Sequence, residues 1–232
     1  MESNKKHKAI ILAAGKGTRM RELSIDTPKP LLKVRGKTLL QHKIEMLPES
    51  VDEVIIVVGY LKDKITDELG DMCEGRKITY VMQDELLGTA HSLWMAKDFL
   101  KNEERFLVMM GDDLYSKRDM EECLKYEYSI LVRDTDSLKD KAKVVFDESG
   151  HIQDIIEKYQ IDESGFVCSG MYSITPKIFD YEMIKLPNGE YGLPQTILAM
   201  KNDVNIKAVE ASFWIQITAP EDLVIAENHL AL

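Results

Sequence analysis

The first half of the chain alternates between continuous apolar runs and stretches in which apolar residues recur every three or four positions. Continuous runs are typical of parallel strands buried on both faces, and the wider spacing is typical of helices. Strands are expected at residues 9–12, 54–58, 78–82 and 106–110. Helices are expected at residues 38–47, with Thr38 as the N-cap, 61–69 and 89–100. This order predicts an α/β fold built on a mostly parallel, doubly wound sheet.

The second half of the chain is richer in strands. Strands are expected at residues 128–132, 143–146, 152–156, 166–174, 206–209 and 213–217. Helices are expected at residues 193–200 and 220–230, the latter with Pro220 in its first turn. No linker, internal repeat or low-complexity segment interrupts the pattern. We therefore expect one domain over residues 1–232, with a mixed, mostly parallel sheet flanked by helices.

Composition narrows the classes of partner. With 232 residues, of which 44% are hydrophobic and 30% charged, the chain is long enough for one well-buried α/β domain. Its net charge of −10 argues against a nucleic-acid partner, because such partners are held by a basic face. A small phosphorylated substrate in a locally basic pocket is compatible with this charge.

The cysteines and the N-terminus indicate a compartment. Cys73, Cys123 and Cys168 are widely spaced and form no Cys-x-x-Cys pair, so neither a zinc site nor a disulfide framework is indicated. We expect buried thiols in a reducing environment. Residues 1–8 are polar and basic, with no long apolar run behind them. No signal peptide or membrane span is expected, and the protein is predicted to be cytoplasmic.

The strand at residues 9–12 runs directly into a loop of small residues at 13–18. Arg19 follows at once, and Lys29 stands between two prolines. Glycines let backbone N–H groups turn toward an anion, and nearby guanidinium and ammonium groups bind phosphate. The stretch therefore predicts a nucleoside triphosphate site.

Two better-known phosphate loops do not fit this stretch. The P-loop requires Gly-Lys-Ser/Thr after a four-residue spacer, whereas Lys16 lies between Gly15 and Gly17. The dinucleotide fingerprint requires a third glycine where a helix packs closely on the strand, and the bulky Met20 stands there. Another kind of nucleotide loop is indicated.

The stretch resembles the N-terminal signature of the sugar-phosphate nucleotidyltransferases, also called nucleoside-diphosphate-sugar pyrophosphorylases. The matching residues are Leu12, Ala13, Ala14, Gly15, Gly17, Thr18, Arg19, Pro28, Lys29 and Pro30. The resemblance implies a Rossmann-like fold in which this loop binds the nucleotide, Arg19 holds the leaving pyrophosphate and Lys29 neutralises the transition state. It spans nearly the whole chain, from Lys8 to about Asn228, without the C-terminal β-helix extension of some relatives.

A second motif follows the strand at 78–82. Gln83, Gly88 and Thr89 match the family pattern of glutamine, a four-residue spacer and Gly-Thr-Ala. The resemblance implies that the glutamine and the glycine backbone read the edge of the nucleobase. An amide side chain, with donors and an acceptor, suits that task. Taken alone, the motif would equally predict a polar loop that ends in Thr89 as a helix N-cap.

A third motif, Gly111-Asp112-Asp113, stands where the strand at 106–110 ends. Ligands of such folds bind at the carboxyl ends of the strands, and a carboxylate there can hold Mg²⁺ between phosphate oxygens. By resemblance, Asp112 is the catalytic metal ligand and Gly111 borders the substrate. Asp113 falls at a variable position, where we expect a helper or a loop cap.

The sugar side is expected from the second half of the chain. Glu157 and Lys158 resemble the family element in which glutamate bonds sugar hydroxyls and lysine holds the phosphate of the sugar 1-phosphate. Gly170 resembles the glycine that lies under the sugar, and Glu190 is a weaker candidate for a second hydroxyl ligand. Tyr159 replaces a frequent proline, and the sequence after Glu190 departs from the family, so the sugar pocket is expected to be unusual.

The C-terminal motif contains the main departure. Where the family usually has a second metal-binding aspartate, this chain has Gln216. A neutral amide supplies a weaker field to Mg²⁺ than a carboxylate does. Weak ligation, contact through a water and no ligation all stay open for Gln216.

The resemblance implies a Mg²⁺-dependent enzyme that condenses a nucleoside triphosphate with a sugar 1-phosphate and releases pyrophosphate. Arg19, Lys29, Asp112 and Lys158 are its expected catalytic residues, and they position reactants and neutralise charge. Two alternatives stay open: a cytidylyltransferase that acts on phosphocholine, and a non-catalytic nucleotide or sugar-nucleotide sensor. The sequence leaves open the base, the sugar and whether the chain forms a homo-oligomer.

Overall fold

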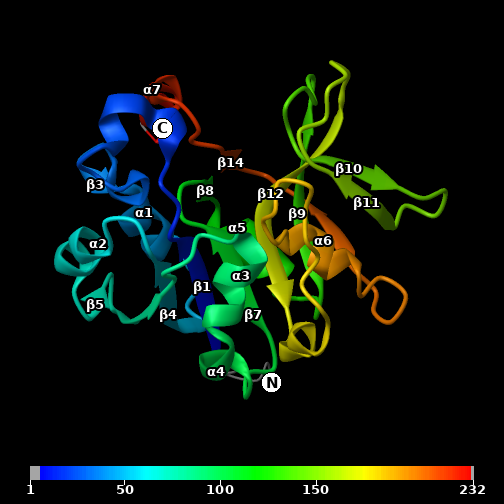
Figure 1. Cartoon of the computed structure of the whole chain (residues 1–232), viewed down its shortest axis with the longest axis horizontal. Coiled ribbons are helices and arrows are strands. Elements are labelled where there is room, and N and C mark those ends of the chain that lie inside the picture. Colours follow the sequence, from blue (N-terminus) through cyan, green and yellow to red (C-terminus); the bar gives the residue numbers. More distant parts are fainter. Residues whose placement is uncertain (1–5, 231–232) are drawn as a thin grey trace.

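The computed structural model describes residues 6–230, and its central feature is one large sheet (Figure 1). Its strands are β1 (His7–Ala13), β4 (Val51–Val58), β5 (Met72–Cys73), β6 (Arg76–Met82), β7 (Phe106–Met110), β9 (Ser129–Thr135), β10 (Lys143–Phe146), β11 (Ile152–Ile156), β12 (Gly165–Ile174) and β13 (Lys207–Glu210). The main strand order is β11-β10-β12-β7-β1-β4-β6-β5, with β9 and β13 joined beside β12. The neighbours β7, β1, β4 and β6 are parallel. Strand β12 pairs antiparallel with β7, β9 and β10, which confirms a mixed sheet with a doubly wound parallel core.

Helices cover both faces of this sheet. They are α1 (Leu39–Glu45), α2 (Lys62–Leu69), α3 (Thr89–Met95), α4 (Lys97–Leu100), α5 (Lys117–Cys123), α6 (Leu193–Leu198) and α7 (Pro220–His229), with short 3₁₀ helices η1 (Thr18–Ser24), η2 (Lys29–Leu31) and η3 (Pro176–Asp180). Helix α1 begins as expected at Thr38, whose hydroxyl accepts a hydrogen bond from the Gln41 N–H while the Gln41 side chain accepts one from the Thr38 N–H.

Alternate residues of β1 point to opposite sides of the sheet, and each side has its own core. Ile10 and Leu12 pack with apolar residues of α3, α4 and α6. Ala9 and Ile11 pack with apolar residues of α1, α2 and α5. Because both faces of β1 are buried, the strand is a continuous apolar run rather than an alternating one.

A third apolar cluster joins the N-terminal loop to the C-terminal segment. Met20 of η1 is fully buried there with Ile215 and Ile217. The cluster lies beside short strand pairs: β2 (Lys33–Val34) with β3 (Lys37–Thr38), and β8 (Leu114–Tyr115) with β14 (Trp214–Ile215). The chain thus returns its last segment to the place where β7 ends.

Some boundaries differ from the sequence expectation. The helix expected at 89–100 is divided at Ala96, whose backbone leaves the helical region (φ −91°, ψ 1°). The strand expected at 213–217 is reduced to β14 because only Trp214 and Ile215 pair with β8. Helix α5 was not predicted, since its sequence is mostly charged, although Ser116 caps it through the Asp119 N–H.

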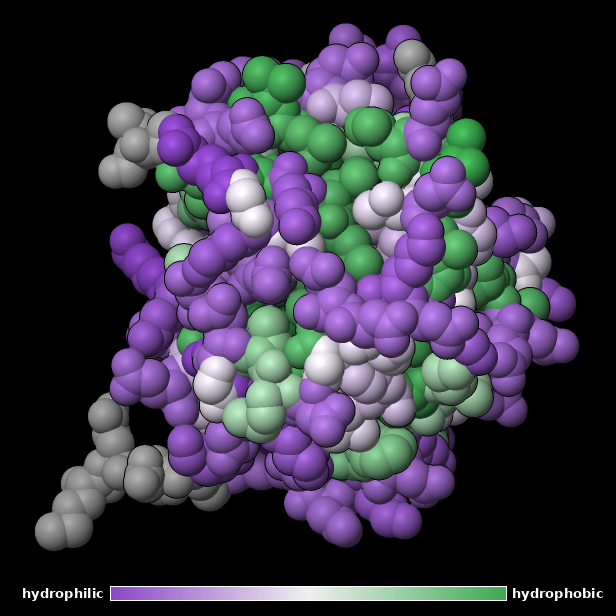
Figure 2. Space-filling view, turned by 90° about the vertical axis from the view of Figure 1, so that its left-hand side faces the viewer, coloured by the Kyte–Doolittle hydropathy of each residue, from purple (hydrophilic) through white to green (hydrophobic). Residues whose placement is uncertain are grey.

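The face that carries α1 and α2 is mainly hydrophilic, as Figure 2 shows. Apolar residues gather in its upper part, at the level of α7 in Figure 1. In α7, Ala226 is buried, whereas Val224 and Ile225 are exposed. Among residues 6–230, no helix has the length and apolar character needed to cross a membrane. The expected absence of a signal peptide concerns residues 1–8, of which 1–5 lie outside the described residues.

Candidate functional site

Three loops meet at the carboxyl end of the parallel strands. Residues 14–17 follow β1, residues 83–88 follow β6, and residues 111–113 follow β7. Parallel neighbours bring these ends to one edge of the sheet, the place where folds of this class bind ligands. The motifs singled out in the sequence are therefore adjacent in space.

Two cavities open at this edge. The first, of about 500 Å³, is lined by the glycine loop, the loop after β6 and the end of β7. The second, of about 930 Å³, is lined by residues of β12, the segments 139–142 and 157–158, and the C-terminal segment. The residues common to both walls are Arg19, Thr89, Met110, Asp112 and Glu190. The two cavities therefore adjoin, with one cation and two carboxylates at their boundary.

The glycine loop is shaped for close approach to a ligand. Gly17 has φ +63°, and a Cβ there would lie 2.9 Å from the Cβ of Lys29. Gly15 lines the first cavity and faces open space, because a Cβ added to it would meet no atom of the described residues within 4 Å. Met20, which stands where a dinucleotide loop has its third glycine, is buried in the third apolar cluster instead.

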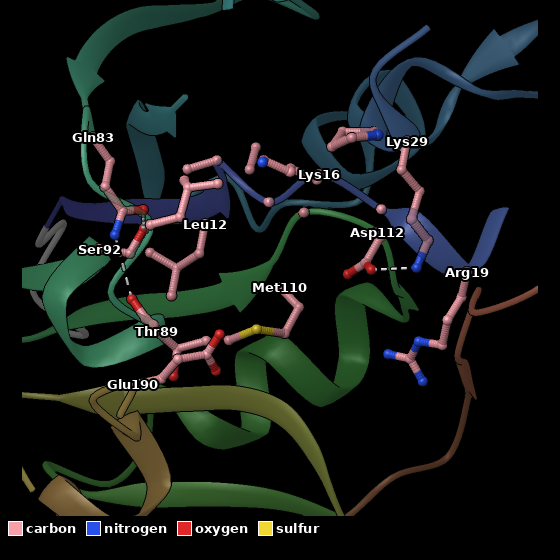
Figure 3. Close-up of a pocket in the computed structure, with 18 residues that line it drawn as sticks. Leu12, Lys16, Arg19, Lys29, Gln83, Thr89, Ser92, Met110, Asp112 and Glu190 are labelled. Carbon is pink, nitrogen blue, oxygen red and sulfur yellow. Dashed lines mark hydrogen bonds and ion pairs between the residues drawn. The ribbon is translucent and has the colours of Figure 1, made fainter. Parts of the chain in front are cut away.

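Lys29 and Asp112 form an ion pair, with 2.5 Å between Lys29 Nζ and Asp112 Oδ2. The Lys29 side chain is 6% exposed and that of Asp112 34% exposed, so only the carboxylate reaches well into the cavities. Figure 3 shows Arg19 on the same side of the cavity as this pair, with Gln83, Ser92 and Thr89 on the opposite side. The site thus has a charged end and an amide-and-hydroxyl end.

Asp113 is buried rather than exposed at a loop. Its carboxylate accepts a hydrogen bond from Trp214 Nε1 at 3.1 Å, and its backbone carbonyl accepts one from the buried Lys43 ammonium of α1. Burial, with the neighbouring Asp112 charge, raises the pKa of Asp113 to about 7. Burial also lowers the pKa of Lys43 to about 8. Asp113 is therefore fixed from inside the fold, through Trp214 and Lys43.

This burial predicts a pH dependence of stability. Because the folded state holds the Asp113 proton more tightly than the unfolded chain, this group stabilises the fold fully below its ordinary pKa and progressively less as pH rises through about 7. We compare the free energy of unfolding of the metal-free wild type with that of Asp113→Asn. The difference, wild type minus variant, should fall as the pH rises from about 4 to about 7. Urea denaturation at each pH measures it, and a flat or rising difference would contradict the burial argument.

Gln83 lies at the amide end of the first cavity and is 4% exposed. Its side chain bonds to Ser92 and His91 of α3. Gly88, not Thr89, is the N-cap of α3, and the Thr89 hydroxyl accepts a hydrogen bond from the Leu193 N–H at 3.0 Å. This corrects the alternative interpretation of Thr89 as a cap. Gly88 has φ +99°, and a Cβ there would meet the Tyr191 backbone at 2.6 Å.

The second cavity contains the residues expected on the sugar side. Glu157, Lys158, Gly170, Glu190 and Gln216 all line it. Lys158, the second residue after β11, is exposed and has φ +51°, an uncommon backbone for a lysine. Of the departures noted in the sequence, Tyr191, Gly192 and Pro194 line this cavity and not the first one, whereas Tyr159 only follows the lining residue Lys158.

Gly170 has both a left-handed backbone and a close neighbour. Its φ is +77°, and a Cβ would lie 2.6 Å from Met110 Cγ. We expect Gly170→Ala to lower the free energy of unfolding by about 2 kcal/mol, through strain and displacement of Met110. Gly150→Ala is the matched control, because Gly150 has φ +80° but no atom of the described residues within 4 Å of a Cβ. Equal losses in urea denaturation would show that the Met110 contact is unimportant.

Some expected residues lie elsewhere than their assigned role suggests. Thr18, expected with the nucleotide, lines the second cavity, and Gly111, expected with the substrate, lines the first. A Cβ on Gly111 would lie 2.8 Å from the Leu12 carbonyl, so close packing between β7 and β1 explains this glycine. Sequence reasoning missed Lys16, Leu86, Ser92, Met110, Lys139 and Lys141 on the cavity walls. Lys16, Leu86 and Met110 lie within or directly beside recognised motifs, whereas no motif includes Lys139 or Lys141.

The oxygen donors at the boundary fit a divalent cation such as Mg²⁺. Asp112 lines both cavities, and Asp113 and Gln216 line the second. Mg²⁺ is usually held by one or two carboxylates together with substrate phosphates, and this donor set fits that pattern. Within residues 6–230, no group of three or more His, Cys, Asp and Glu side chains is arranged as a metal site.

Known proteins resemble this chain over nearly its full length. The family described as nucleotidyl transferase matches residues 8–231. The bifunctional protein GlmU of Methanocaldococcus jannaschii is 34% identical over 96% of this chain, which spans only 54% of that relative. The UTP–glucose-1-phosphate uridylyltransferase AglF of Haloferax volcanii is 33% identical over 96% of both chains.

A solved structure agrees with these relatives. A putative glucose-1-phosphate thymidylyltransferase from Bacillus anthracis superposes with a TM-score of 0.85 at 25% identity, over 96% of this chain and 94% of that one. Its likeness covers both the parallel core and the later antiparallel strands, which confirms the Rossmann-like fold. Sequence and structure agree that the chain belongs to the nucleotidyl transferase family.

Proposed function

We propose that the protein is a sugar-1-phosphate nucleotidyltransferase, which joins a nucleoside triphosphate to a sugar 1-phosphate and releases pyrophosphate. The observation that carries the proposal is the pair of adjoining cavities, with Arg19 and Asp112 on the wall between them. Two substrates that occupied the two cavities would meet at these charges. The named activities of the relatives support the same reaction class.

The first cavity would hold the triphosphate. The glycine loop offers backbone N–H groups to phosphate oxygens, and the exposed Arg19 binds the departing pyrophosphate. Lys29 is held beside Asp112 and neutralises charge that develops at the α-phosphate. Gln83 and Gly88, at the other end, contact the base.

The second cavity would hold the sugar 1-phosphate. Lys158 binds its phosphate and orients one oxygen toward the α-phosphorus, in line with the leaving pyrophosphate. Glu157 and Glu190 accept hydrogen bonds from sugar hydroxyls, and Gly170 leaves room beneath the ring. Asp112, with Asp113 and Gln216 nearby, would hold Mg²⁺, which neutralises phosphate charge when bound.

Pyrophosphate release tests this proposal. Common nucleoside triphosphates are paired with several sugar 1-phosphates and with phosphocholine, with Mg²⁺ and without it. We expect Mg²⁺-dependent release with at least one sugar 1-phosphate. Release with phosphocholine alone would assign the cytidylyltransferase alternative, and nucleotide binding without release in any pair would assign the sensor alternative.

A further inference from the structure

The side chain of Gln83 is held by three polar contacts at the base end of the first cavity. Ser92 Oγ lies 2.9 Å from Gln83 Oε1, and His91 Nδ1 lies 2.9 Å from Gln83 Nε2. A third contact joins Nε2 to the Gly88 carbonyl oxygen at 3.4 Å. Ser92 and His91 are successive residues of α3, so a rigid element carries both contacts.

The third contact determines which way the amide points. A carbonyl oxygen only accepts hydrogen bonds, so the amide atom that faces Gly88 must be the nitrogen. Nε2 therefore donates to His91, whose Nδ1 accepts and whose proton lies on Nε2 of the ring. Oε1 then faces Ser92, and the serine hydroxyl donates to it. The reversed amide would place two oxygens against each other at Gly88.

This orientation limits what Gln83 can offer to a ligand. Both Nε2 hydrogens are used within the protein, and one lone pair of Oε1 is used by Ser92. The remaining lone pair of Oε1 is an acceptor only. We infer that the Gly88 carbonyl orients the amide and that His91 and Ser92 are positioning residues for base selection: they hold the amide against that carbonyl, so that Gln83 is fixed as a hydrogen-bond acceptor. This inference rests on the proposed function, in which the first cavity binds a nucleoside triphosphate.

A fixed acceptor must discriminate within each pair of related bases. Uracil donates at N3 and accepts at its exocyclic oxygen, whereas cytosine accepts at N3 and donates from its exocyclic amine. Guanine and adenine differ in the same way at N1 and at the exocyclic group. An acceptor opposite either position favours one member of the pair. An amide that is free to turn could offer N–H or oxygen and would satisfy both, so discrimination depends on the contacts from His91 and Ser92 that keep the amide against the Gly88 carbonyl.

Nucleotide binding without sugar phosphate provides the test. The dissociation constants of UTP and CTP, and of GTP and ATP, are measured by calorimetric titration for the wild type, Ser92→Ala and His91→Leu. We expect the ratio of the two dissociation constants within the preferred pair to fall about fivefold in each variant, because about one hydrogen bond's contribution to the selection is lost. His91→Asn, which retains an acceptor near Nδ1, should keep most of the ratio.

Ser129→Ala is the matched control. Ser129 is also a buried serine, and its hydroxyl donates to the Cys123 carbonyl at 3.1 Å, outside both cavities. We expect this change to lower stability and to leave the ratio unchanged. His91 is only half-buried, so we expect His91→Leu to fold. Its dissociation constants can then be measured even if Ser92→Ala unfolds.

Unchanged ratios in His91→Leu and in folded Ser92→Ala would overturn the inference, and so would a wild type that binds both members of each pair equally. Pyrophosphate release is measured in parallel for the wild type. A wild type that shows the shift in binding ratios but no release with any substrate pair would retain the inference and reject the proposed transfer reaction.

Discussion

Asp112→Asn is expected to reduce Mg²⁺-dependent pyrophosphate release on the order of 10³-fold, equivalent to about 4 kcal/mol of transition-state stabilisation. Asp112 is the only residue of the Gly111-Asp112-Asp113 turn, among the described residues, that lines both cavities. Its carboxylate therefore lies where both sets of phosphate oxygens would meet a cation. An amide retains the shape but removes the charge, so turnover should fall much more than nucleotide binding. Initial rates and titration of nucleotide in metal-free buffer measure the two effects separately.

The same substitution leaves the Lys29 ammonium without its carboxylate partner. Because the Lys29 side chain is only 6% exposed, Asp112→Asn should also lower stability. Adding Lys29→Met should restore part of the stability and none of the activity. Glu53→Gln is the matched control, since Glu53 pairs with Lys8 and Lys77 away from both cavities. Activity that follows stability across these variants would assign Asp112 a structural role alone.

The sequence predicted the fold best where burial alone determines which residues a segment can contain. Continuous apolar runs predicted the parallel core, because strands buried on both faces tolerate little else. The limits of β10 and β11 agree with the expected residues. Short elements such as β8 and β14 could not be predicted, because their pairing depends on the return of a segment about a hundred residues later.

In the candidate site, too, residues within local motifs could be predicted, and residues that only the fold brings together could not. Gly15, Gly17, Arg19, Lys29 and Asp112 fall in two compact motifs, and the structure places all of them around the first cavity. Lys43 carries no such signal: in the sequence it is one charged residue of an amphipathic helix. Only the fold shows that its ammonium is buried against the Asp113 carbonyl. Likewise, nothing local indicates that Ser92 and His91 hold Gln83.

Arg19→Ala is expected to reduce kcat/KM for the nucleoside triphosphate by about 10² to 10³, without loss of stability. Arg19 is exposed and lines both cavities, and its guanidinium lies at the charged end of the site in Figure 3. A planar guanidinium can bond two phosphate oxygens at once, and its charge opposes the negative charge that grows on the leaving pyrophosphate. An exposed side chain of this kind contributes little to packing, so the melting temperature should stay within about a degree of the wild-type value.

Two further variants separate charge from geometry at Arg19. Arg19→Lys keeps the positive charge but loses the forked donors, and we expect an activity between those of the wild type and Arg19→Ala. Arg118→Ala is the matched control, since Arg118 is exposed on α5 and lines neither cavity. Steady-state kinetics at fixed ionic strength measure all three. If Arg118→Ala lost as much activity as Arg19→Ala, the effect would come from the net charge of the protein and not from a phosphate contact. A full wild-type rate in Arg19→Ala would remove the guanidinium from the mechanism and leave the glycine loop and Lys29 to hold the pyrophosphate.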